Sequence, residues 1–262
     1  MRFSDRIRTL FVAPGTVALS WIGQAGFLLK TASGKVIVID PCLTDYVYDC
    51  NCAKTGLGFK RLAPALFEPD ELRIDLFLSS HEHEDHMDMP MIPAVLENPS
   101  VRIFCNKPSV ELMRASNLLD NRTTCICVGD HIDLGDCTLI VTDCDHGDDC
   151  PEALGFVLDF GFTSIYYSGD TALTPSMLQM PLEKKPKVAL LPINGEFGNL
   201  GSEDAAKYAA MLESRVCIPH HFYTFALHGG DPRDAISAFP KFAPDCELAL
   251  LTPGEIRIFG GE

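Results

Sequence analysis

Residues 76–86 read LFLSSHEHEDH, and this stretch decides how the rest of the chain is interpreted. Its apolar start predicts the end of a buried strand, and an H-x-H-x-D-H motif follows directly. His81 and His83 are two positions apart, so in an extended backbone both imidazoles project to one side and could reach the same metal ion. Asp85 and His86 lie beyond the bend and could face a second ion. The spacing differs from the H-E-x-x-H pattern, in which two histidines share one face of a helix.

The alternative interpretation of this motif is a solvated loop rich in acids and histidines. The whole chain holds eight histidines in 262 residues, so chance gives little reason to find three of them within six positions. A helix is also predicted at 89–97, which places the motif on a tight connection between a strand and a helix. We therefore interpret the motif as a metal site.

Four other apolar strands also end in side chains that can bind metal. Chain segments that leave one edge of a sheet can converge in space, and functional sites form at such edges. The residues in question are Asp40 after 36–39, His146 after 137–141, Asp170 after 164–167, and the pair His220 and His221 after 215–218.

Each of these residues also has an ordinary structural interpretation. His146 could be a surface or capping histidine, Asp170 a turn or helix-capping aspartate, and His220 or His221 a core histidine. Their joint placement at strand ends, together with the H-x-H-x-D-H motif, favours metal ligation for the set. The sequence leaves open whether His220 or His221 is the ligand.

The order of predicted elements indicates an α/β fold in which two sheets pack together with helices outside. No repeat or polar linker interrupts the chain, so we expect one domain over 1–262. Strands are predicted at 17–20, 26–30, 36–39, 72–78, 101–104, 137–141, 155–159, 164–167, 188–191, 215–218, 248–251 and 256–259. Helices are predicted at 89–97, 109–116, 176–179, 202–214 and 232–239.

Composition restricts the functional classes further. A hydrophobic content of 47% is enough for a sizeable core, and a net charge of −15 disfavours nucleic acid and anionic membranes as partners. No apolar run approaches the roughly 18 residues that a membrane span needs. Eleven cysteines in a chain of this length are expected to be reduced thiols, so we predict a cytoplasmic location.

The ordered set of motifs resembles the metallo-β-lactamase superfamily. Five elements match in order along the chain: Asp40 in VIVIDP, the 81–86 motif, His146, Asp170 in SGDT, and the histidine after Pro219. The resemblance implies a four-layer αβ/βα sandwich whose metals lie at one sheet edge. By position, it implies a first ion held by His81, His83 and His146, a second held by Asp85, His86 and His221, a bridging Asp170, and an Asp40 that orients a ligand.

Within that superfamily, the chain looks most like the L-ascorbate-6-phosphate lactonase group. The resemblance is carried by WIGQAGF at 21–27, GLGFKRL at 56–62, PING at 192–195 and PHHF at 219–222. It implies a hydrolase that uses a metal-bound hydroxide to open a lactone or ester of a small anionic sugar derivative. Asp85 and Asp170 are then the predicted catalytic residues. The ligand types suit Zn²⁺, Mn²⁺ or Fe²⁺, and the lactonase resemblance favours Mn²⁺.

An anionic substrate needs a cationic or polar anchor. The predicted substrate contacts are Lys60, Arg61, Asn194 and His228, and the alternative for each is an ordinary surface or turn residue. Two other functions compete on the same site: hydrolysis of phosphodiesters or phospholipids, and a non-enzymatic metal-binding scaffold. We expect neither nucleic acid nor a membrane as a partner, and a homo-oligomer stays open.

Overall fold

The computed structural model describes residues 1–260 and contains two mixed sheets of seven strands each. In the first sheet the strands β14, β1, β2 and β3 are antiparallel neighbours, whereas β3, β4, β5 and β6 run parallel. The order across this sheet is β14 (Ile256–Gly260), β1 (Thr16–Gly23), β2 (Gly26–Thr31), β3 (Val36–Ile39), β4 (Leu76–Ser79), β5 (Arg102–Cys105) and β6 (Thr123–Cys125).

The second sheet repeats this division into an antiparallel and a parallel half. β7 to β10 pair antiparallel, and β10 to β13 pair parallel. Its order is β13 (Glu247–Leu248), β12 (Val216–His220), β11 (Val188–Pro192), β10 (Ser164–Tyr167), β9 (Leu154–Asp159), β8 (Thr138–Asp143) and β7 (His131–Asp133).

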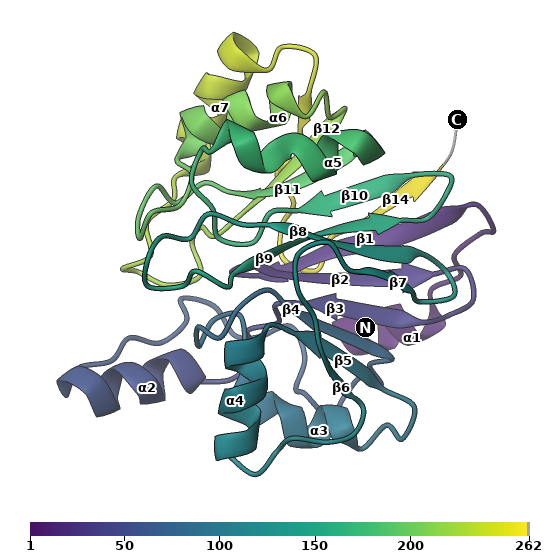
Figure 1. Cartoon of the computed structure of the whole chain (residues 1–262), viewed down its shortest axis with the longest axis vertical. Helices are drawn as coiled ribbons and strands as arrows, with labels where there is room; N and C mark the ends of the chain where they lie inside the picture. Colours follow the sequence, from purple (N-terminus) through teal and green to yellow (C-terminus); the bar gives the residue numbers. More distant parts are fainter. Residues whose placement is uncertain (261–262) are drawn as a thin grey trace.

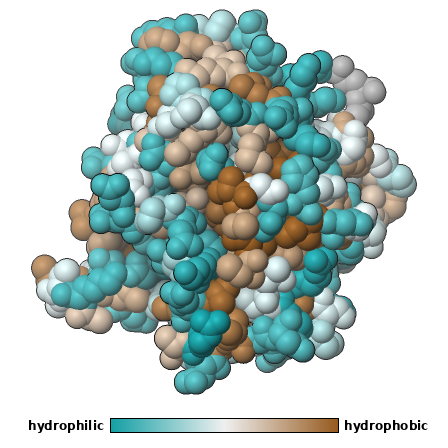
Figure 2. Space-filling model, in the orientation of Figure 1, coloured by the Kyte–Doolittle hydropathy of each residue, from teal (hydrophilic) through white to brown (hydrophobic). Residues whose placement is uncertain are grey.

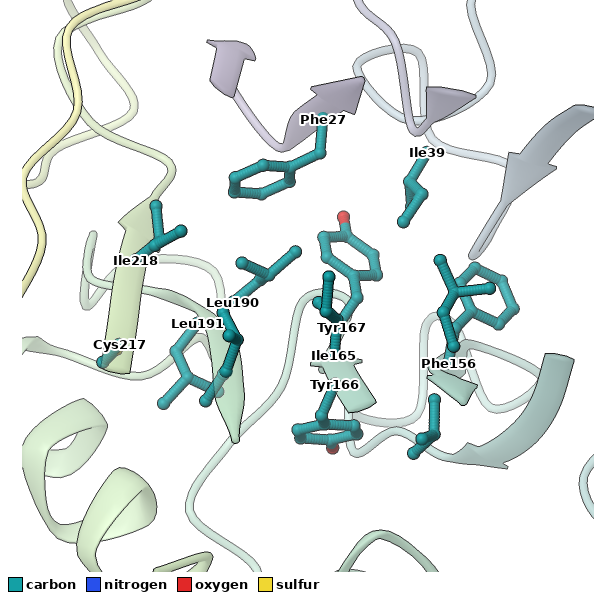
Figure 3. Close-up of a cluster of buried hydrophobic side chains, with 14 of the residues drawn as sticks. Phe27, Ile39, Phe156, Ile165, Tyr166, Tyr167, Leu190, Leu191, Cys217 and Ile218 are labelled. Carbon is teal, nitrogen blue, oxygen red and sulfur yellow. The ribbon is translucent and has the colours of Figure 1, made fainter. Parts of the chain in front are cut away.

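The two sheets pack face to face around an apolar core. Figure 3 shows Tyr167 pointing between Phe27 and Ile39 of the first sheet, while the adjacent Tyr166 points the opposite way. Successive side chains of a strand alternate between faces, so one strand serves two layers of the core. The Tyr166 hydroxyl lies 3.0 Å from that of Tyr208 on a covering helix. Each large side chain buried in this way contributes roughly 1.5–3 kcal/mol relative to an exposed one.

Helices cover the outer faces of both sheets (Figure 1). α5, α6 and α7 lie over the second sheet, and α1, α3 and α4 contribute to the apolar cluster on the outside of the first. The predicted four-layer sandwich is therefore confirmed. The helices are α1 (Phe3–Thr9), α2 (Tyr46–Thr55), α3 (Ile92–Leu96) after a 3₁₀ turn, α4 (Lys107–Ala115), α5 (Gln179–Lys184), α6 (Ser202–Met211) and α7 (Pro232–Phe242).

Several strands were predicted with the wrong bounds, and the helix α2 was not predicted. The strand predicted at 72–78 begins only at Leu76, and the strand predicted at 248–251 is reduced to Glu247–Leu248. α2 projects from the body of the molecule, at the lower left of Figure 1, and only Val47 is buried in it. Such a helix has no apolar stripe, and the apolar stripe is the signal that a sequence pattern detects.

The hydropathy of the surface follows this layering. Figure 2 shows apolar residues gathered near the middle of one face, over the strands, with hydrophilic residues around them. All eleven cysteines are unpaired, as expected. No helix within residues 1–260 is long and apolar enough to cross a membrane.

Candidate metal centre

The predicted metal-binding residues all follow strands that end at the same edge of the sandwich. Parallel strands bring their carboxyl ends to one edge, and this holds for β3 and β4 in the first sheet and for β10 and β12 in the second. β8 runs in the same direction as β10 because both are antiparallel to β9. The loops that leave these strands gather at the left of Figure 1.

Two sharp turns aim side chains into this edge. Asp40 and His221 have positive φ angles of 43° and 63°, a left-handed conformation that costs most residues roughly 1–3 kcal/mol. Neighbouring strands hold both turns in place. The Asp40 N–H donates to the carbonyl of Leu78 at 2.9 Å, and the His221 N–H donates to the carbonyl of Gln24 at 3.0 Å.

One group of side chains consists of three imidazoles. His83 Nδ1 lies 3.0 Å from His81 Nε2 and 3.2 Å from His146 Nε2. Burial, reinforced by the positive charge of His86, lowers the pKa of both His81 and His146. These rings are therefore neutral at pH 7, which is the form that binds a metal. We call these three residues the histidine cluster.

The second group mixes imidazoles with carboxylates. Asp170 Oδ2 lies 3.1 Å from His221 Nε2 and 3.3 Å from His86 Nε2, and Asp85 Oδ2 lies 3.3 Å from His221 Nε2. We call these four residues, Asp85, His86, Asp170 and His221, the mixed cluster. The pKa values in it are strongly shifted in the metal-free protein. Burial opposes ionisation of Asp85 and Asp170, but the adjacent imidazolium charges outweigh it and bring both carboxyl pKa values well below the ordinary range.

The histidines of the mixed cluster shift in the opposite direction. Burial alone would lower the pKa of His221, but the charges of Asp170 and Asp85 raise it to about 9. The same carboxylates raise the pKa of His86 well above its ordinary value, again against the effect of burial. Without a bound cation, the protons carried by His86 and His221 therefore balance the negative charges of Asp85 and Asp170.

The residues present fit a pair of divalent metal ions. Nitrogen and oxygen donors of this kind suit Zn²⁺, Mn²⁺ and Fe²⁺. Two buried polar atoms, Asp170 Oδ1 and His146 Nδ1, have no hydrogen-bond partner among the described residues. Asp170 also acts electrostatically on His81 and His146, so its carboxylate lies close to both clusters. The bridging role of Asp170 stays a prediction.

Asp40 contacts the mixed cluster from behind. Its Oδ2 lies 2.6 Å from His86 Nδ1 and accepts a hydrogen bond from the Tyr167 hydroxyl at 2.6 Å, and its Oδ1 accepts one from the Ser80 N–H at 2.7 Å. A carboxylate on Nδ1 leaves Nε2 of His86 free to face the cluster. This is the geometry that the predicted orienting role of Asp40 requires.

Two supporting residues were not recognised as such from the sequence. Gln24 Nε2 lies 2.8 Å from Asp85 Oδ2, 3.0 Å from His221 Nδ1 and 2.8 Å from His228 Nδ1. Asn199 Nδ2 donates to Asp170 Oδ2 at 2.8 Å. Gln24 stands in a G-Q-A-G turn at φ 51°, and the two glycines predict a turn there but not the contacts of the amide.

The structure separates the two adjacent histidines that the sequence left open. His220 is fully buried, stacks on Tyr167 with ring centroids 5.3 Å apart, and belongs to neither cluster. His221 lies in the mixed cluster. His220 is the last residue of β12, whereas His221 follows it in a left-handed turn at φ 63°, and this change of backbone direction separates the two side chains.

Three of the four predicted substrate contacts lie outside the pocket above the clusters. Lys60 is exposed and pairs with Asp45, and Arg61 donates to the carbonyl of Cys42. Asn194 lines a separate cavity of about 500 Å³. His228 alone of the four lines the pocket that contains the clusters.

That pocket has a volume of about 590 Å³, within the usual range for small-molecule sites. Residues from both clusters form its floor, and side chains from α2 and five loops form its walls. Its lining comprises Val47, Asn51, Lys54, Phe59, His83, Glu84, Asp85, His146, Asp149, Asp170, Phe197, His221, Leu227 and His228.

The model of the beta-lactamase superfamily domain matches residues 18–221, which is most of the chain and includes both clusters. The chain belongs to the metallo-β-lactamase superfamily. Among its relatives is a UPF0173 metal-dependent hydrolase of Hyperthermus butylicus, 28% identical over 245 residues that make up 91% of this chain and 98% of the relative. A UPF0173 metal-dependent hydrolase of Archaeoglobus fulgidus is 28% identical over 247 residues, 90% and 96% of the two chains.

Solved structures of this superfamily share the fold. Igni18, a metallo hydrolase of Ignicoccus hospitalis, is 23% identical with a TM-score of 0.71, over 94% of this chain and all of the other. An isothiocyanate hydrolase from Delia radicum gut bacteria is 20% identical with a TM-score of 0.76, over 93% and 100% of the two chains. At these identities the likeness establishes the architecture and leaves the substrate undetermined.

Proposed function

We propose that this metallo-β-lactamase superfamily member is a metal-dependent hydrolase that opens a lactone or ester. The observation that carries the proposal is the pair of adjacent clusters that line one pocket, with Asp170 as the proposed bridge between them. The hydrolase names of the relatives that match over nine-tenths of the chain support the same reaction class.

In this proposal the histidine cluster would hold one ion, Asp85, His86 and His221 would hold the other, and Asp170 would be a ligand to both. Asp170 Oδ2 accepts a hydrogen bond from Asn199 at 2.8 Å, and its Oδ1 has no hydrogen-bond partner among the described residues. When bound, a metal pair supplies an activated water at neutral pH and polarises the reacting carbonyl.

The side chains around the ions position the reacting groups. Asp85 and Asp170 are ionised at neutral pH, so either can accept a proton or a hydrogen bond at a free carboxylate oxygen. Burial lowers the pKa of His228, which is neutral and thus acts as a hydrogen-bonding group at the pocket wall. Gln24 ties this ring to Asp85, so a substrate that contacts His228 is placed relative to the mixed cluster.

The resemblance to the L-ascorbate-6-phosphate lactonase group adds a finer prediction, an anionic sugar substrate. Neither Lys60 nor Arg61 lines the pocket, so the two predicted anchors give that prediction no support. The carbonyl chemistry does not depend on them. Phosphodiester hydrolysis stays the second candidate, because a metal pair of this kind serves both chemistries.

The test is a hydrolysis panel on protein reconstituted separately with Mn²⁺, Zn²⁺ and Fe²⁺. The panel holds plain lactones, a phosphorylated sugar lactone, simple esters and a phosphodiester. We expect lactone or ester turnover that falls at least about 1,000-fold in Asp170→Ala. Asp159→Ala, at the far end of β9, is the matched control and should retain activity.

Each alternative has its own outcome in this panel. Phosphodiester cleavage without lactone or ester turnover would keep the metal centre and discard the substrate class. A lower stability of Asp170→Ala, with every tested activity unchanged, would favour a metal-binding scaffold.

A further inference from the structure

We propose that the pocket takes an uncharged substrate with an apolar group, which packs against Val47, Phe59, Phe197 and Leu227. The proposal deepens the proposed hydrolase function and rests on it, because it assigns the substrate class of the same site. It departs from the anionic sugar that the resemblance implies.

The first observation is the position of the apolar side chains. All four line the pocket whose floor holds the two clusters, and they come from α2 and from three different loops. Phe197 and Leu227 are 63% and 66% exposed. Large apolar side chains held at a pocket mouth are stabilised when an apolar ligand covers them.

The second observation is an aromatic wall against the mixed cluster. The His228 ring lies 5.5 Å from Phe59, 5.6 Å from Phe197 and 4.9 Å from Phe225, measured between ring centroids. It also stacks on His221 at 5.8 Å. The apolar wall therefore begins directly beside the proposed metal ligands, so a substrate that reaches the metals lies along it.

The third observation is the backbone of Phe197. Its φ angle is 56°, a left-handed conformation that bulky residues rarely adopt, and it precedes Gly198 at φ 83°. Outliers of this kind concentrate at ligand-binding sites. Here the turn presents an aromatic ring at the pocket mouth, where an extended backbone would point it elsewhere.

The fourth observation concerns charge. Lys54 is the single lysine or arginine in the lining given above, and it pairs with Glu84. Asp149 adds a negative charge to the same wall. Apart from the two clusters, these three side chains sum to a net charge of −1. A phosphate or carboxylate on the substrate would thus meet no free cation on the described walls.

A binding measurement tests the pocket without any turnover. The neutral fluorescent probe N-phenyl-1-naphthylamine is titrated into the full-length protein loaded with Zn²⁺. We expect the double variant Phe197→Ala, Leu227→Ala to bind it about tenfold or more weakly, since each truncation removes an apolar contact. Leu57→Ala removes an exposed leucine (80% exposed) that does not line the pocket, and this variant should bind the probe as the wild type does. Unchanged binding in the double variant would overturn the proposal.

A hydrolysis series tests the same pocket through turnover. 4-Nitrophenyl acetate, butyrate and hexanoate are compared with the charged hemisuccinate ester. We expect kcat/KM to rise about tenfold or more from acetate to hexanoate, and the hexanoate-to-acetate ratio to collapse in the double variant. A preference for the hemisuccinate, or a ratio that the double variant leaves unchanged, would overturn the proposal.

The two measurements separate the failure of this inference from failure of the proposed function. If the probe binds as expected and no ester or lactone is hydrolysed, the apolar pocket stands and the proposed reaction fails. If kcat/KM for esters does not depend on acyl chain length and the probe binds the double variant as tightly as the wild type, the proposed reaction stands and the apolar pocket fails. If only a partner protein, and not the probe, covers Phe197 and Leu227, the small-molecule proposal is overturned.

Discussion

The histidine cluster and the mixed cluster lie side by side, yet before metal binds their histidines differ in protonation. In the first, burial keeps the rings of His81 and His146 neutral, so these two rings have no proton to release when an ion binds. In the second, carboxylates and imidazolium ions neutralise each other, so binding must release protons. The difference teaches that one centre can combine a site ready for metal with a site that stores protons until the metal displaces them.

The largest test of this comparison is Asp170→Ala, because Asp170 belongs to the mixed cluster and is the predicted bridge to the histidine cluster. We expect the affinity for both ions to fall more than about 100-fold, since a ligand loss exceeds the loss of an orienting residue. The measurement is metal content after dialysis against a weak chelator. Retention of one full ion would break the comparison and assign Asp170 to a single cluster.

The next test is the stability of the metal-free protein as a function of pH. The folded pKa of His221 is raised to about 9 from an ordinary value of 6.5, so its contribution is fully present below about pH 6.5 and is lost as pH rises through about 9. The contribution is of the order of 3 kcal/mol, from roughly 1.4 kcal/mol for each unit of pKa. Asp85 and Asp170, whose pKa values are lowered, stabilise the fold above about pH 4 and lose this effect only in acid.

Urea unfolding at pH 6 and pH 9, with and without Zn²⁺, measures this effect. Without metal, the protein should be less stable at pH 9 than at pH 6. With metal the order should reverse, because the ion replaces the protons. Equal stability of the metal-free protein at pH 6 and pH 9 would contradict the inferred difference in protonation between the clusters.

The smallest test is Asp40→Asn, which changes the acceptor directly on His86 Nδ1, whereas Asp40 reaches His81 through the Ser80 hydroxyl. We expect affinity for one ion to fall about 10-fold to 100-fold and affinity for the other to stay the same. Competition titration with a metal indicator resolves the two. Equal weakening of both ions would show that the clusters are not independent.

The sandwich could be predicted from the sequence, and so could the convergence of the predicted metal-binding residues at one edge. Both predictions follow from local patterns. Apolar strands that end in His81, Asp170 or His221 can be recognised without knowing what they contact. Gln24 and Asn199 could not be recognised in this way. Their roles depend on partners at 61 and 29 positions' separation, and an amide side chain carries no pattern of its own.

The predicted anchors Lys60 and Arg61 lie outside the pocket for a related reason. Lys60 and Arg61 lie in the segment that follows α2, close in sequence to Phe59, which does line the pocket. A charged residue near a site in sequence is oriented by its own contacts, here Asp45 and Cys42. The direction in which such a side chain points is a tertiary property, so composition and spacing could not decide it.

The contact of Gln24 with His221 joins residues 197 positions apart. Contacts of such sequence separation form late in folding, since the entropy of closing a long loop must be overcome first. Most of the chain must therefore be synthesised, and both sheets assembled, before the mixed cluster exists. Incorporation of its ion would then report that folding is complete, and a chain released before residue 221 could never acquire it.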